Sequence, residues 1–336
     1  MNYNLNSGYG RLQATALAVA GPTFGRILVV MPSDDPNYDT MADIIKPDPD
    51  GDVRLFTTVA AAYAAAETNR NDVILLSTNS SHTISSMLTV AKNRVHFVGM
   101  DACTRIGTGH GARLVMGVTT VATDLAVVKV TGSRNSFKNI KFESSNTKDE
   151  SLYALIDSGA YTSYENCSVL KLTDLDEATA ADVIFGGTGT DWINCEFGAA
   201  TVLATAARPV AIIDKSLSVS NGMIDNHFLN CTFVSYTDQA TRYFIKLVAN
   251  QDGQRYAMFR GCSFINWDLI GSGTTMTFAI YAVSTNANLY MIFDANTTCT
   301  GCTSFGDDTN AAGVMTMGAS PTAATAGVSV ASITND

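Results

Sequence analysis

Three acidic residues on one predicted loop are the first candidates for chemistry in this sequence. Asp174, Asp176 and Glu177 lie close together between two short apolar runs. Carboxylates at this spacing can act as an acid–base pair or bind a cation. Charges on a polar loop are more often simply hydrated, and we favour that interpretation. The three residues remain the site that a carbohydrate-binding function would use.

Two other segments have the composition of ligand sites without the required spacing. Asp48, Asp50 and Asp52 flank Gly51 and resemble a Ca²⁺ loop, but the closing Glu is missing. The glycines of residues 106–111 are not followed by the helix and lysine that a phosphate-binding loop needs. We interpret the first segment as a turn and the second as a loop.

The histidines and cysteines predict neither a metal site nor a cofactor. The four histidines are scattered, and those that fall in strand patterns, His96 and His227, are interpreted as structural. The seven cysteines are an odd number, which argues against a disulfide framework. No basic residue stands beside the repeated cysteines to lower the pKa of a thiol, so we interpret these cysteines as small buried hydrophobic residues. The histidines are His82, His96, His110 and His227.

A short motif repeats along the chain and organises it. Its pattern is aromatic-x-Asn-Cys-x-Phe, and a looser sixth copy ends at Cys302 and Phe305. The cysteines 167, 195, 231, 262 and 302 are separated by 28, 36, 31 and 40 residues, which are spacings typical of solenoid repeats. The five clear copies are Phe137–Phe142, Tyr164–Val169, Trp192–Phe197, Phe228–Phe233 and Phe259–Phe264.

The residue types within the motif predict which side chains are buried. Cys and Phe two residues apart share one face of a strand, and the polar residue between them points to the other face. The leading aromatic also points inward only if the chain bends at the Asn or Gly, which adopt left-handed conformations at low cost. Stacked coils would then form internal ladders. The predicted ladder residues are Asn139, Asn166, Asn194, Asn230, Cys167, Cys195, Cys231, Cys262, Phe142, Phe197, Phe233 and Phe264.

Each motif copy has a neighbouring short apolar run, rich in Val, Ile and aromatics, which is typical of a strand. Two or three strands per repeat with no helix between them indicate a parallel β-helix. The motif resembles the pectate-lyase-like right-handed β-helix superfamily over roughly residues 72–318. The resemblance implies an all-β, single-stranded right-handed parallel β-helix (solenoid) with a short N-terminal capping helix and extended terminal arms.

The enzyme signatures of that superfamily are nearly absent. The lyase stretch Trp-Ile-Asp-His is approximated by Asp191-Trp-Ile-Asn194, and Arg-x-Pro-x-x-Arg by Arg208-Pro209 without the second Arg. The polygalacturonase pattern is absent, since Asp307-Asp308 has no histidine nearby. From the missing signatures we expect no enzyme activity and no catalytic residue.

The two ends of the chain differ from its middle. Residues 57–68 place Val59, Ala62, Tyr63 and Ala66 on one helical stripe, with Thr57 or Thr58 as N-cap, and predict a helix that caps the solenoid. The tail is almost entirely Ala, Thr, Ser, Gly, Val and Met. We therefore divide the chain into an N-terminal arm and turn-rich region (1–56), the capping helix and β-helix (57–310), and a low-complexity tail (311–336).

Charge and composition exclude several classes of protein. The 336 residues include 21 Lys and Arg against 31 Asp and Glu, a net charge of −10, which argues against a nucleic-acid partner. No apolar run reaches the length of a membrane span and no secretory signal is recognisable, so we expect no membrane partner and synthesis in a cytoplasm. With 46% hydrophobic residues the chain is expected to fold.

The order of segments resembles virion proteins of tailed bacteriophages. An Asp-Pro-rich turn region precedes an Ala-rich helix and a β-helix that opens at Asn71. The resemblance implies a homotrimer on the virion surface. The preferred interpretation is a capsid decoration (cement) protein that binds the major capsid protein shell through its arms. The alternative is a tailspike or fibre-type β-helix that binds or cleaves a host surface glycan.

Overall fold

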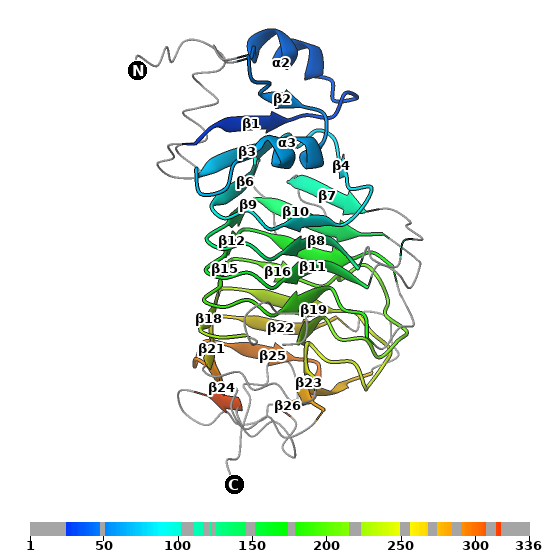
Figure 1. Cartoon of the computed structure of the whole chain (residues 1–336). Helices are drawn as coiled ribbons and strands as arrows, with labels where there is room; N and C mark the ends of the chain where they lie inside the picture. Colours follow the sequence, from blue (N-terminus) through cyan, green and yellow to red (C-terminus); the bar gives the residue numbers. More distant parts are fainter. Residues whose placement is uncertain are drawn as a thin grey trace.

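The chain folds into a parallel β-helix in the computed structural model (Figure 1), and the repeated motif recurs in five successive coils. Strands far apart in the sequence pair in parallel into three sheets, so the predicted all-β parallel solenoid is confirmed. The structure describes residues 25–47, 51–101, 111–116, 121, 125–145, 152–173, 179–214, 223–248, 256–267, 274–283, 290–306 and 314–316. No helix in these ranges is long and apolar enough to cross a membrane.

The three sheets run along the solenoid, and each of the eight complete coils in the described part of the chain contributes one strand to each sheet. Sheet A has eleven strands, in the order β2 (Leu55–Phe56), β1 (Ile27–Val30), β3 (Asp72–Leu76), β6 (Val95–Gly99), β9 (Ser136–Lys138), β12 (Ser163–Glu165), β15 (Asp191–Ile193), β18 (Asn226–Leu229), β21 (Tyr256–Arg260), β24 (Tyr290–Phe293) and β27 (Val314–Thr316). Sheet B has eight strands, from β4 (His82–Thr83) through β7 (Ala112–Met116), β10 (Ile140–Ser144), β13 (Ser168–Lys171), β16 (Glu196–Phe197), β19 (Thr232–Ser235) and β22 (Ser263–Asn266) to β25 (Thr298–Thr300). Sheet C also has eight, from β5 (Leu88–Val90) through β8 (Ala126–Val130), β11 (Tyr153–Asp157), β14 (Val183–Phe185), β17 (Ala211–Ile213), β20 (Ile245–Leu247) and β23 (Met276–Ala282) to β26 (Cys302–Gly306).

The bend predicted at the motif Asn or Gly lies between sheet A and sheet B. Asn194, Asn230 and Gly261 have φ angles of 53°, 53° and 60°, in the left-handed region that these residue types enter most readily. The bend turns the aromatic before it and the Cys after it to the same interior. Trp192 stacks on Tyr164, with ring centroids 3.9 Å apart. The motif therefore buries the apolar residues of both strands that it joins.

The predicted ladder residues lie in register along the interior. Phe197, Phe233 and Phe264 are paired neighbours in successive coils and fully buried. The thiol of Cys231 donates to the carbonyl oxygen of Trp192 in the preceding coil (3.3 Å), and Cys262 likewise to Phe228 (3.5 Å). Asn166 Nδ2 donates to Asn139 Oδ1 at 3.3 Å. The remaining members occupy equivalent positions, with Asn139 and Asn166 also at positive φ, and with Cys167, Cys195 and Phe142 buried.

One repeat assignment is wrong. The strand register pairs Ser263 with Thr298, so the residue that follows Cys262 in the next coil is Thr297 and not Cys302. Cys302 instead begins β26 in sheet C, where it pairs with Met276. The sixth copy was misplaced because its spacing was judged from the sequence alone, whereas the ladder is defined by which residues are hydrogen-bonded neighbours.

The solenoid begins earlier than the sequence indicated. β1 and β2 belong to sheet A although they lie within residues 1–56, the segment expected to be an arm and turns. The helix α2 (Tyr38–Ile44), which the sequence analysis missed, follows the Asp-Pro turn, and Met41 packs with Ile27 and Val29 outside the sheet. A seven-residue helix with a single apolar contact leaves too weak a periodicity to detect. The arms proper, residues 1–24 and 317–336, lie outside the described residues.

The predicted capping helix is α3 (Val59–Ala65), and Thr58 is its N-cap, accepting a hydrogen bond from Ala61 N at 3.2 Å. Val59 and Ala62 are buried in the core cluster that also holds Leu28 and Ile74. The helix therefore covers the apolar interior at the N-terminal end of the solenoid.

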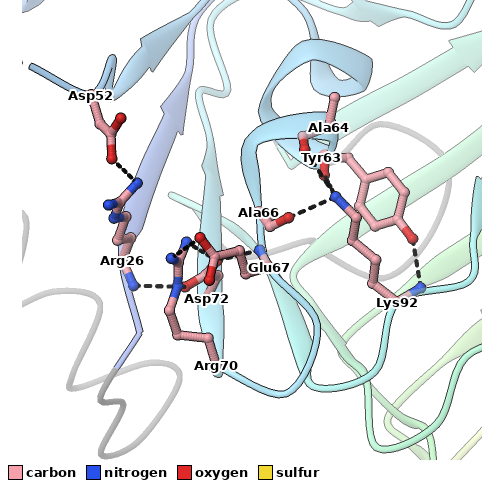
Figure 2. Close-up of polar contacts among 9 residues, drawn as sticks. All are labelled: Arg26, Asp52, Tyr63, Ala64, Ala66, Glu67, Arg70, Asp72 and Lys92. Atoms are coloured by element: carbon pink, nitrogen blue, oxygen red, sulfur yellow. Dashed lines mark hydrogen bonds and ion pairs between the residues drawn. The ribbon is translucent and has the colours of Figure 1, made fainter.

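Polar side chains fix this cap to the first coils (Figure 2). Lys92 Nζ donates to the carbonyl oxygens of Tyr63, Ala64 and Ala66 at 2.8, 2.9 and 2.6 Å, where the helix dipole favours a cation. The buried carboxylate of Asp72 accepts two hydrogen bonds from Arg70, each at 2.6 Å, and one from Glu67 N at 2.7 Å. These contacts hold the C-terminal end of α3 against β3 and the turn after β5.

Candidate functional site

The outer face of sheet A carries a shallow groove that spans three consecutive coils. In β15, β18 and β21, the residues that alternate with the buried aromatics point outward. Strand register aligns Asp191, His227 and Met258 in one outward column and Ile193, Leu229 and Arg260 in the next. Between them lies a groove of about 250 Å³, with Trp192 and Phe228 also lining it.

A carboxylate and an imidazole form the polar pair of this groove. His227 Nδ1 lies 3.2 Å from Asp191 Oδ1, and both side chains are about half exposed. Because a carboxylate only accepts hydrogen bonds, Nδ1 donates in this pair. Asp191 thereby orients the ring and leaves Nε2 to exchange a proton or a hydrogen bond with a ligand.

Two side chains extend the pair. The ring of Tyr256 stacks on that of His227, with centroids 6.1 Å apart and planes 20° apart, and remains 36% exposed. Arg260 is exposed at the other side of the groove, where its guanidinium can donate to hydroxyl or carboxylate oxygens. The groove thus combines a proton-exchanging group and a cationic donor, and the aromatic surface of Tyr256 lies next to it.

A buried carboxyl group lies behind the groove strands. Asp157 accepts hydrogen bonds from Thr190 Oγ1 (2.9 Å) and Tyr164 OH (3.2 Å). Burial raises the pKa of Asp157 from 3.8 to about 7, against the opposing effect of these hydrogen bonds. Thr190 immediately precedes Asp191, so the buried group is connected to the groove through one residue of the chain.

The two segments that approximate lyase signatures lie in different parts of the structure. Asp191 belongs to the groove, whereas the side chain of Arg208 is 2% exposed, donates to Thr173 O (3.3 Å) and pairs with Asp182 (3.6 Å). Burial and the charge of Arg208 lower the pKa of nearby Lys171 to about 7. We interpret Arg208 as part of a buried ionic cluster at the corner between sheets B and C.

The other sequence candidates that the structure describes lie away from this groove. Asp174, Asp176, Glu177, Asp48, Asp50, His110 and Asp307-Asp308 lie outside the described residues. Asp52 forms an ion pair with Arg26 near the N-terminal cap. His82 Nε2 bonds Ser77 O (2.8 Å) and His96 Nδ1 bonds Ser136 Oγ (2.7 Å), and burial lowers the pKa of both rings.

His227 differs from the structural role expected of it. It was placed in a strand pattern correctly, but it lies on the outward side of that strand. The detectable signal was its position directly before the motif aromatic, which Asp191 and Met258 share in neighbouring copies. No cluster of His, Cys, Asp or Glu suited to a metal ion occurs among the described residues.

Comparisons with known proteins reveal shared architecture and no close relative. No protein-family model matches the sequence, and no curated protein matches it. A pectate lyase structure is 14% identical, with a TM-score of 0.50 over 88% of this chain and 69% of that one. A pectin methylesterase from Aspergillus niger is 15% identical, with a TM-score of 0.48 over 89% and 82%. A protein of Geobacillus virus E2, ORF18, is 11% identical, with a TM-score of 0.45 over 73% and 46%.

These comparisons agree with the right-handed parallel β-helix and correct one expectation. We expected no enzyme activity, but a pectin methylesterase and a pectate lyase, each with a TM-score of 0.50, are among the structural neighbours and are enzymes. The expectation of no enzyme activity was wrong because it relied on signature residues that lie close together in the sequence. In a solenoid, residues of one site come from successive coils about 30 positions apart. At these identities the likeness concerns the fold and assigns no activity to this chain.

Proposed function

We propose that the chain binds a saccharide polymer in the groove between the two outward columns of sheet A. The observation that carries this proposal is the alignment of Asp191, His227 and Met258 beside Ile193, Leu229 and Arg260 over three coils. Successive coils are about 4.8 Å apart, so a linear ligand along the solenoid axis meets a new pair of side chains in each coil.

The side chains match the chemistry of a sugar chain. The exposed ring of Tyr256 offers an apolar surface with a polar tip, which suits the mixed character of a pyranose. His227 Nε2 and the guanidinium of Arg260 bind ring hydroxyl or carboxylate oxygens. This interpretation keeps the glycan-binding alternative from the sequence and moves its site from the loop carboxylates to the sheet.

The polar pair also provides for proton transfer. With Nδ1 held by Asp191, His227 can accept or donate a proton at Nε2 when a saccharide bond near it reacts. Binding of the saccharide and cleavage of its bonds should therefore both be measured.

A glycan array followed by calorimetric titration tests the proposal. Replacing Arg260 by Ala is expected to weaken saccharide binding at least tenfold, which corresponds to about 1.4 kcal/mol. Tyr256→Ala should also weaken binding. If the saccharide is cleaved, His227→Ala should abolish release of new reducing ends.

The matched control is Lys138→Ala, which removes an ion pair with Glu165 (2.8 Å) on the same face outside the groove. Binding should be unchanged in this variant. Equal binding by wild type and Arg260→Ala would overturn the groove as the site. Loss of binding on replacing Asp174, Asp176 and Glu177 by Ala instead would return the site to that loop.

The virion role remains a second proposal. Its support is the order of segments along the chain, in which an Asp-Pro turn region and the Ala-rich helix α3 precede the coils from β3 onward. A homotrimer that decorates the major capsid protein shell should have three times the chain mass of 35.6 kDa in solution and co-sediment with empty shells. A monomer that ignores shells would reject this role without affecting the groove.

A further inference from the structure

Two cysteines at the last corner between sheets B and C form a Cys-x-x-Cys pair. Cys299 lies in β25, Gly301 follows that strand with a φ of +75°, and Cys302 begins β26. The left-handed turn at Gly301 is tight, since a Cβ there would lie 2.6 Å from the Cβ of Asn266. Both side chains face the same interior, since Cys299 belongs to the buried core cluster and Cys302 packs against that cluster.

This pair differs from the cysteine ladder in accessibility. The ladder thiols of Cys167, Cys195, Cys231 and Cys262 donate to backbone carbonyl oxygens and are each no more than 2% exposed. Cys299 is 3% exposed, whereas Cys302 is partly exposed and packs at the margin of the core. A small reagent can therefore reach a thiol of the pair and not one of the ladder.

The sequence spacing adds a second distinction. The ladder cysteines are on separate coils, about 30 residues apart in the sequence. Cys299 and Cys302 are separated by two residues across a turn, where small backbone adjustments can bring two sulfurs to bonding distance. Both are free thiols in this structure.

We propose that Cys299 and Cys302 are a redox site that forms an intrachain disulfide by exchange with a low-molecular-weight disulfide such as oxidised glutathione. The Cys302 thiolate attacks one glutathione sulfur and releases one glutathione thiolate. The Cys299 thiolate then attacks Cys302 Sγ and displaces the second glutathione. Two protein thiols are oxidised, one glutathione disulfide is reduced to two thiols, and the protons pass to the released thiolates.

Intact-mass spectrometry of the native full chain in glutathione buffers tests this proposal. Contact with Cys299 and burial raise the pKa of the Cys302 thiol, so the incubation is made at alkaline pH, where more of the thiol is ionised. The expected result is the loss of two hydrogen masses in a fraction of chains that rises with the ratio of oxidised to reduced glutathione. Dithiothreitol should restore the original mass.

Peptide mapping and two variants locate the bridge. Cys302→Ser should abolish the two-hydrogen loss, whereas Cys262→Ala, which changes a ladder thiol, should retain it. The mapped peptide of the oxidised wild type should join Cys299 to Cys302, and this result stands even if a variant does not fold. An unchanged mass, a persistent glutathione adduct on Cys302, or a bridge to Cys103 would overturn the proposal.

Discussion

The inward and outward sides of sheet A follow different rules. Inward, Tyr164, Trp192 and Phe228 form a stack of nearly parallel rings, all but fully buried. Outward, the same strands carry Asp191 and His227, which share no residue type. The interior meets the same environment in each coil, so aromatic residues recur there, whereas the outer face is not constrained by packing and can vary with function.

The test with the largest expected effect replaces neighbouring inward and outward residues of one strand. Trp192→Ala should lower the free energy of unfolding by about 3–5 kcal/mol, because it leaves a cavity in the ring stack. Ile193→Ala, at the adjacent outward position, should cost about 1 kcal/mol or less. Urea denaturation measures both, and equal losses would show that the outer face is packed as tightly as the core.

A second test compares an inward carboxyl group, Asp157, with the outward Asp191. The pKa of Asp157 is raised to about 7, so the folded chain binds a proton that the unfolded chain has lost between pH about 4 and 7. Stability should therefore fall as pH rises through this window, by about 4 kcal/mol at most.

Urea denaturation at several pH values checks this slope. Asp157→Asn should flatten it, because the amide does not ionise, while Asp191→Asn should leave it in place. Retention of the full slope in Asp157→Asn would assign the pH dependence to another group.

The test with the smallest expected effect concerns the bend that separates the two strands of the motif. Asn194 has a φ of 53°, so Asn194→Ala should cost about 1–2 kcal/mol through left-handed backbone strain. Asn194→Gly should be nearly neutral, since Gly261 occupies the equivalent position two coils later. Thermal unfolding compares the variants. Similar melting temperatures for Ala and Gly would show that the side-chain amide, and not the backbone, matters there.

The sequence was sufficient for the parts of the fold that repeat. The motif predicted the solenoid, the inward aromatics and the bend at Asn194 because each copy supplied the same evidence again. Thr58 and the apolar stripe starting at Val59 likewise predicted the capping helix. β1 and α2 were missed because neither carries a copy of the motif, and because α2 has few apolar residues.

The candidate site was predictable only in part. His227 and Asp191 were both noticed, but as separate features 36 residues apart. Their contact depends on β15 and β18 being adjacent in register, which the variable loops between coils conceal. The same uncertainty in the register between coils led us to assign Cys302 to a sixth copy of the motif, although strand pairing puts it in a different sheet.

The residues that fill each coil follow from the local sequence, because burial and backbone conformation act on residues within one short motif. Strand pairing between coils sets which outward residues share a groove and in which sheet each cysteine lies. Coil length varies from copy to copy, so sequence spacing does not give the register between coils. That register is set by interstrand hydrogen bonds and ring stacking. Those interactions join residues about 30 positions apart, and local sequence patterns do not specify them.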